Sequence, residues 1–222
     1  SFNYEISFPN WNAKNFSTNT ILTYHDEKYD NNIHKNICNY YELIHIMNKI
    51  IDTNNFFLIK SSCLGCFRNR SHIVFSDKIH VGMNKDLRES VIKMKEEFEK
   101  YSIHLIDNKD ENFIMLELVN IATAKIHFYD IIDNLVIIRD NKEQSISLDD
   151  IGNLKKYNYG PIRVNSLEYP SNYLKSLYGN DVFSVLRHNN FEIKIPKYVY
   201  DCYYNQWSSY TSDYWKNQQI KN

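Results

Sequence analysis

The spacing of apolar residues over residues 40–60 predicts a helix followed by a short buried strand. Within 40–52 the apolar side chains recur at i, i+1, i+4, i+7 and i+8, which places them on one face of a helix. Residues 56–60 form a short, continuous apolar run, which is typical of a strand buried on both faces. The small residues Ser61 and Ser62 then predict a turn into a short helix. A second strand is expected over 79–83.

The rest of the chain alternates between strand-like and helical patterns. A helix is expected over 86–98, with Asp86 as its N-cap. A second helix is expected to begin at Pro170 and to end at Gly179. Strands are expected over 103–106, 113–119, 125–129, 134–139 and 193–196. Together these elements predict an α+β fold in which a mixed sheet is flanked by helices.

Three segments differ in character and suggest a domain organisation. Residues 1–36 are polar and aromatic without a sustained period, so we expect an irregular arm lying on the domain. Residues 37–197 hold the predicted helices and strands. Residues 198–222 are dense in Tyr and Trp without interleaved basic residues, which favours packing or a protein partner over base stacking.

Composition narrows the classes of partner. The 222 residues are 43% hydrophobic with a net charge of -1, so nothing predicts nonspecific binding of nucleic acid. No apolar run approaches the ~20 residues of a membrane span. Sequons at Asn15 and Asn69 leave two compartments open, a secretory lumen after loss of an upstream anchor, or a virion or cytoplasm. The bias toward Asn, Ile, Lys and Tyr suggests an AT-rich genome, such as that of a protist or a large DNA virus.

The stretch 61–83 carries the strongest candidate chemistry. It reads SSCLGCFR followed by IVFSDKIHVG, and it resembles the signature of the LicD/fukutin family. The shared residues are Leu64, Gly65, Arg68, Ile73 and Gly82. A second stretch, 169–181, resembles the family's downstream element with its Pro, Leu, Tyr-Gly and Asp. The resemblance implies a nucleotidyltransferase-like fold and the transfer of phosphocholine or ribitol phosphate from CDP carriers onto glycans.

The resemblance also implies where carboxylates should hold a metal ion. The family's alternating aspartates correspond to Ser76, Lys78 and His80, with Asp77 between them. A further carboxylate position of the family, on a later strand, corresponds to His127 in Ile-His-Phe. Ammonium repels Mg²⁺, and Mg²⁺ seldom accepts imidazole, so Mg²⁺ is not expected as a cofactor. Ser61, Ser62, Arg68 and Lys78 are the residues that the resemblance places around phosphate.

Several hypotheses follow from these substitutions. The first is a catalytically inactive domain kept for binding or structural assembly. The second is a working glycan phosphotransferase with non-standard ligands and a CDP-linked donor. The third is a nucleotide or phosphate binder that uses Lys78 and Arg68 without metal, and the fourth is a zinc site at His80 and His127, with His104 as a further ligand. The Cys-x-x-Cys at Cys63 and Cys66 favours packing in a tight turn over zinc or redox chemistry.

Overall fold

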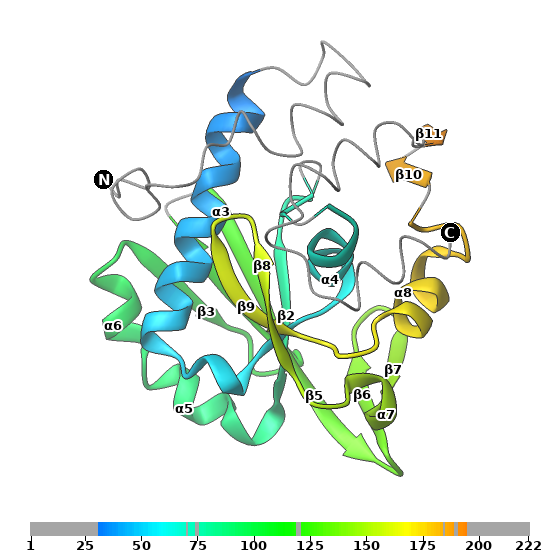
Figure 1. Cartoon of the computed structure of the whole chain (residues 1–222). Coiled ribbons are helices and arrows are strands. Elements are labelled where there is room, and N and C mark those ends of the chain that lie inside the picture. The colour runs from blue at the N-terminus through cyan, green and yellow to red at the C-terminus, as the bar shows by residue number, and fades with distance from the viewer. Residues whose placement is uncertain are drawn as a thin grey trace.

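The computed structural model describes residues 31–69, 71–73, 76–118, 121–183, 185–188 and 191–194. Residues 1–30 of the predicted arm and the whole predicted extension 198–222 lie outside these ranges. The described part is a mixed sheet with helices on its faces, so the predicted α+β class is confirmed (Figure 1).

A seven-stranded mixed sheet forms the centre of the fold. Its strands are β1 (Phe57–Leu58), β2 (Ile79–Asn84), β3 (Ile103–Asp107), β4 (Phe113–Leu118), β5 (Ala122–Ile132), β6 (Leu135–Arg139) and β7 (Glu143–Ser147). The order is β1-β2-β5-β4-β3, and β6 pairs with β5 and with β7. Only the β2–β5 pair within this sheet is parallel. The eleven-residue strand β5 pairs with β2, β4 and β6 and is therefore the central strand of the sheet.

Helix α3 (Asn31–Ile50) covers one face of the sheet (Figure 1). Its buried side chains Leu43, Ile44 and Met47 follow the predicted stripe and pack into the core. The helix begins nine residues before the predicted start at Tyr40, in a polar segment without apolar period. Residues 31–36, which were expected in the irregular arm, are thus helical.

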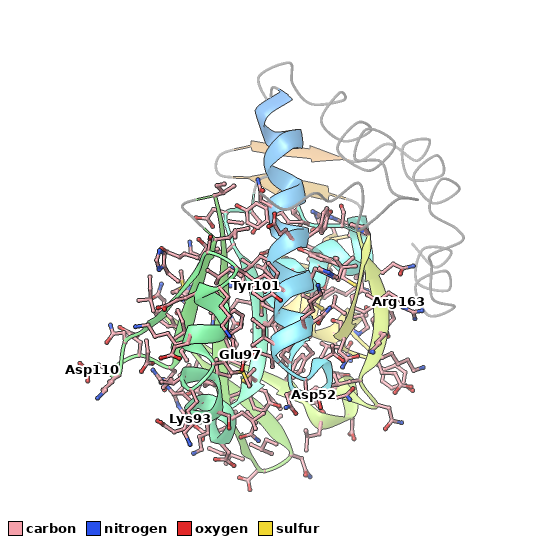
Figure 2. All side chains as sticks on the ribbon, turned by 90° about the vertical axis from the view of Figure 1, so that its left-hand side faces the viewer. Asp52, Lys93, Glu97, Tyr101, Asp110 and Arg163 are labelled. Atoms are coloured by element: carbon pink, nitrogen blue, oxygen red, sulfur yellow. The ribbon has the colours of Figure 1, made fainter. Side chains whose placement is uncertain are left out.

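The segment after β2 is broken into short helices, where one helix was expected over 86–98. It consists of η5 (Lys85–Leu87), α5 (Arg88–Ile92) and α6 (Lys95–Glu99). The cap is Asn84, whose Oδ1 accepts the backbone N–H of Asp86 at 2.9 Å, so the predicted cap at Asp86 was wrong by two residues. Val91 and Phe98 are buried, while Lys93 and Glu97 point outward as predicted for the charged face (Figure 2).

Two hairpins and two helices complete the described chain. They are α7 (Leu148–Ile151), β8 (Lys155–Tyr159), β9 (Ile162–Ser166), α8 (Ser171–Tyr178), β10 (Val185–His188) and β11 (Phe191–Lys194), with a short η3 (Thr53–Asn55) earlier in the chain. Helix α8 begins after Pro170 and is capped by Gly179, as predicted. The turn between β8 and β9 needs Gly160, because its φ is +57° and a β-carbon there would lie 2.4 Å from the ring of Tyr41.

None of the described helices has both the length and the apolar character that crossing a bilayer requires.

Candidate functional site

The parallel pairing of β2 and β5 places the candidate residues on one face of the sheet. His80 is in register with Lys125, and Gly82 is in register with His127. Since side chains two residues apart on a strand share a face, these four positions lie on the same side. The intervening residues Ile79, Val81, Ala124 and Ile126 are buried in the core on the opposite face.

His80 and His127 contact each other directly. Nδ1 of His80 and Nε2 of His127 are 3.0 Å apart, at hydrogen-bond distance, and the ring centroids are 5.2 Å apart. The side chain of His127 is buried, with only 2% of its surface exposed. The structure therefore brings together His80 and His127, two of the positions at which the family resemblance expects carboxylates.

Two lysines and one aspartate surround this histidine pair. The helix α4 (Lys60–Leu64) begins at Lys60, and its Nζ lies 2.6 Å from Oδ2 of Asp140. The Nζ of Lys125 lies 3.4 Å from Oδ1 of the same carboxylate, and Nδ1 of His127 lies 3.8 Å from Oδ2. All three charged side chains are at most 18% exposed. We refer to Lys60, His80, Lys125, His127 and Asp140 as the lysine–histidine cluster.

Burial and the neighbouring charges fix the protonation states in the lysine–histidine cluster. Burial lowers the pKa of His80 and of His127 well below the usual range, and the nearby charges of Lys60 and Lys125 lower both further. Burial opposes ionisation of Asp140, but the hydrogen bond from Lys60 and the two ammonium charges outweigh it and hold its pKa well below the usual range. At neutral pH the two ammonium groups thus face one carboxylate, which leaves one positive charge in excess.

Lys60 is held in a strained backbone conformation. Its φ of +51° lies in the left-handed region, which a non-glycine residue seldom adopts. Its backbone N–H donates to the hydroxyl of Tyr173, at 2.9 Å, from the buried side of α8. This contact ties the start of α4 to α8 and orients the Lys60 side chain toward the sheet.

The Tyr173→Phe variant is expected to lose about 1–2 kcal/mol of unfolding free energy, because it leaves the Lys60 N–H without its acceptor. Urea unfolding at pH 7.5 measures this loss. Tyr101→Phe serves as the control, since Tyr101 is exposed on the surface (Figure 2). Equal stability of the two variants would show that the Lys60–Tyr173 contact does not support the fold.

The residues predicted to surround phosphate are used mostly by internal contacts. The hydroxyl of Ser62 accepts the backbone N–H of His80 at 2.8 Å, and that of Ser61 lies 3.2 Å from the hydroxyl of Ser76. The side chain of Lys78 pairs with Asp77 at 2.9 Å. Arg68 is buried in the short π-helix η4 (Gly65–Asn69), and its Nη1 donates to the carbonyl of Val182 at 3.1 Å.

The lysine–histidine cluster does not fit a divalent cation. Mg²⁺ prefers several oxygen ligands, whereas here one carboxylate is already engaged by two ammonium groups. For zinc, the facing nitrogens of His80 and His127 are directed at each other, and His104 is exposed on β3, which β4 separates from β5. Within the described ranges, no group of three or more His, Cys, Asp or Glu side chains is placed to share a metal ion.

Sequence reasoning missed three members of the lysine–histidine cluster. Lys125 had a usable signal, because it lies two residues before His127 on the same strand and so shares its face. Lys60 and Asp140 had none, since their positions depend on the turn after β1 and on the turn between β6 and β7.

Cys63 and Cys66 are both buried, and neither forms a disulfide within the described part of the chain. Burial raises the pKa of the Cys63 thiol, which suppresses the reactive thiolate. Their placement agrees with the packing interpretation of the Cys-x-x-Cys motif.

Comparisons with known proteins found only distant structural likenesses. No family model and no curated protein matches the sequence. The lincomycin-bound lincosamide antibiotic adenylyltransferase LnuA is similar at a TM-score of 0.42 and 12% identity, over 77% of this chain and 97% of that one. The solution structure of the antibiotic-resistance factor ANT(2″)-Ia is similar at a TM-score of 0.35 and 11% identity, over 82% of this chain and 91% of that one. The crystal structure of ANT(2″)-Ia in complex with adenylyl-2″-tobramycin is similar at a TM-score of 0.37 and 12% identity, over 81% of this chain and 94% of that one. Each of these three TM-scores is below 0.5, so the likeness is too weak to assign a family or an activity.

Proposed function

We propose that this chain is a nucleotidyltransferase-like domain that binds a phosphate-bearing ligand without metal and does not catalyse transfer. The observation that carries the proposal is the excess positive charge of the lysine–histidine cluster. Two ammonium groups and two neutral imidazoles gather around a single carboxylate on one face of the sheet. A partly buried excess charge favours an anionic partner, and phosphate oxygens suit lysine donors.

The proposed kinship with the LicD/fukutin family gains support from the contact between His80 and His127. Carboxylates that share one metal ion must converge, and His80 and His127, at two of the corresponding positions, converge here. The kinship suggests a cytidine nucleotide as the ligand, either CDP itself or a CDP-linked carrier, and a glycan as a partner. It also explains the absence of transfer, because charge on a transferring phosphoryl group would lack the metal ion that the family's carboxylates hold.

Calorimetric titration with CDP in the presence of EDTA tests the proposed function. We expect binding that weakens at least about tenfold in Lys60→Asn and in Lys125→Gln, because each variant removes one charged donor. Asparagine is chosen at residue 60 because it accepts the left-handed backbone. Lys156→Gln, at an exposed position of β8, is the matched control and should bind like the wild type.

Two results would contradict the proposal. One is no binding of CDP by the wild type at millimolar concentration, or equal binding by all three variants. The other is robust product from CDP-choline or CDP-ribitol with Mg²⁺ or Mn²⁺, which would favour the active phosphotransferase instead.

A further inference from the structure

The carboxylate of Asp140 occupies the centre of the lysine–histidine cluster. Its oxygens lie 2.6 Å from Nζ of Lys60, 3.4 and 3.5 Å from Nζ of Lys125, and 3.8 Å from Nδ1 of His127. One carboxylate thus contacts three of the four nitrogen side chains. An external anion that binds both lysines would have to take the same place.

The Lys60 backbone and the Lys125 ammonium group both have contacts that do not involve Asp140. The backbone of Lys60 is fixed by Tyr173 of α8 at the start of α4. The ammonium of Lys125 lies 4.0 Å from the ring centroid of Phe113 on β4, a cation–π contact. Removing the Asp140 carboxylate would therefore leave the Lys125 ammonium in place over Phe113, and the Lys60 ammonium on a fixed backbone position beside it.

Asp140 itself belongs to a short turn. It follows the last residue of β6, Arg139, and β7 begins at Glu143. Its carboxylate can leave the lysines by rotation about its side-chain bonds, without breaking the pairing of β6 with β7. Asp140 can therefore withdraw from both lysines while the sheet stays intact.

The charge balance indicates which anion could replace Asp140. With Asp140 withdrawn, two positive charges remain in a place that is mostly shielded from water. A terminal phosphate carries nearly two negative charges at pH 7, because its second pKa is about 6. A phosphodiester carries one, so it would only replace Asp140 charge for charge. A terminal phosphate gains a second attraction that Asp140 does not supply.

We propose that Asp140 is a resident anion that offsets one of the two positive charges of the lysine–histidine cluster until a dianionic terminal phosphate displaces it. This inference rests on the proposed phosphate binding and names both the ligand class and the residue that competes with it. The domain is then selective for ligands that end in a phosphate over those in which the phosphate is esterified twice.

Calorimetry in EDTA at pH 7.5 with cytidine 5′-monophosphate and cytidine 3′,5′-cyclic monophosphate tests this inference. The two probes share the base but differ in phosphate charge. The wild type should prefer the 5′-monophosphate at least about tenfold, and Asp140→Asn should bind it about tenfold more tightly than the wild type. Asp130→Asn removes another salt-bridged carboxylate, on β5 away from the cluster, and should change neither affinity.

The outcomes separate this inference from the proposed function. If the wild type binds the 5′-monophosphate and Asp140→Asn binds it equally or more weakly, Asp140 is a structural counterion and the inference falls while phosphate binding stands. Equal affinity of the wild type for the two probes overturns the inference without any variant. If neither the wild type nor Asp140→Asn binds either probe, the proposed function falls as well.

Discussion

Gly65→Ala is expected to destabilise the fold by about 3 kcal/mol, because no space exists for a β-carbon at this position. An added β-carbon would lie 2.4 Å from the backbone oxygen of Ser71 and 3.2 Å from Cγ1 of Ile73. The oxygen belongs to buried backbone, since Ser71 and His72 are both almost fully buried. The clash can only be relieved by separating η4 from the segment 71–73.

That separation should also disturb the segment that leads into β2, which carries His80 of the lysine–histidine cluster. The backbone N–H of Ser71 donates to the carbonyl of Gly65 at 3.2 Å, so the two segments are bonded where the clash would occur. His72 follows directly, and its Nε2 lies 2.8 Å from the carbonyl oxygen of Ser76, which precedes β2. We therefore expect weaker CDP binding by Gly65→Ala in addition to its lower stability.

Gly82→Ala provides a matched control for the same chemical change. The nearest atoms to its added β-carbon are side-chain atoms of Ile59 and Phe57, both at 3.3 Å. Side chains can shift by a few tenths of an ångström, so a loss below about 1.5 kcal/mol is expected. Urea unfolding of the two variants at pH 7.5 compares them. If Gly65→Ala were no less stable than Gly82→Ala, the Gly65–Ser71 contact would not be rigid.

Apolar patterns predicted the apolar strands of the central sheet and missed β7 and the hairpin of β8 and β9. The expected strands 79–83, 103–106 and 134–139 correspond to β2, β3 and β6, because burial required their apolar residues. By contrast, β7 and β8 carry mostly polar side chains and were not predicted. Their pairing partners β6 and β9 hold them in place, and such long-range pairing leaves little signal in the local sequence.

The residues that match the LicD/fukutin signature turn out to be largely packing residues. Gly65 permits the close approach of Ser71, Gly82 lies against Phe57, and Arg68 is buried against the carbonyl of Val182. A signature of this kind predicts how backbone segments meet. The contact between His80 and His127 could be anticipated from it because both lie on neighbouring strands. The roles of Lys60 and Asp140 could not, since side chains from two distant turns had to be placed first.

Acidification from pH 7.5 to 5.5 is expected to lower the unfolding free energy by about 4 kcal/mol, because three histidines are kept neutral in the fold. His72 is buried, with Nδ1 2.8 Å from the Tyr159 hydroxyl, and burial lowers its pKa to about 4. In the unfolded chain its pKa is about 6.5. As pH falls, the unfolded chain therefore takes up the proton first. This contribution to stability is complete above pH 6.5 and is lost between pH 6.5 and 4. Over the two pH units tested, His72 alone accounts for about 1.4 kcal/mol.

His80 and His127 contribute with the same sign, since burial and the lysine charges lower the pKa of both. The carboxylates of Asp77, Asp130 and Asp140 have lowered pKa values, so their contributions to stability are lost only at more acidic pH.

Urea unfolding of the wild type, His72→Gln and His104→Gln at both pH values isolates the contribution of the buried His72. His104 is exposed on β3, so His104→Gln should keep the acid loss of the wild type. His72→Gln should reduce the loss by about 1.4 kcal/mol, because glutamine takes up no proton in either state. An acid loss in His72→Gln as large as that of the wild type would mean that His72 is already charged in the folded protein.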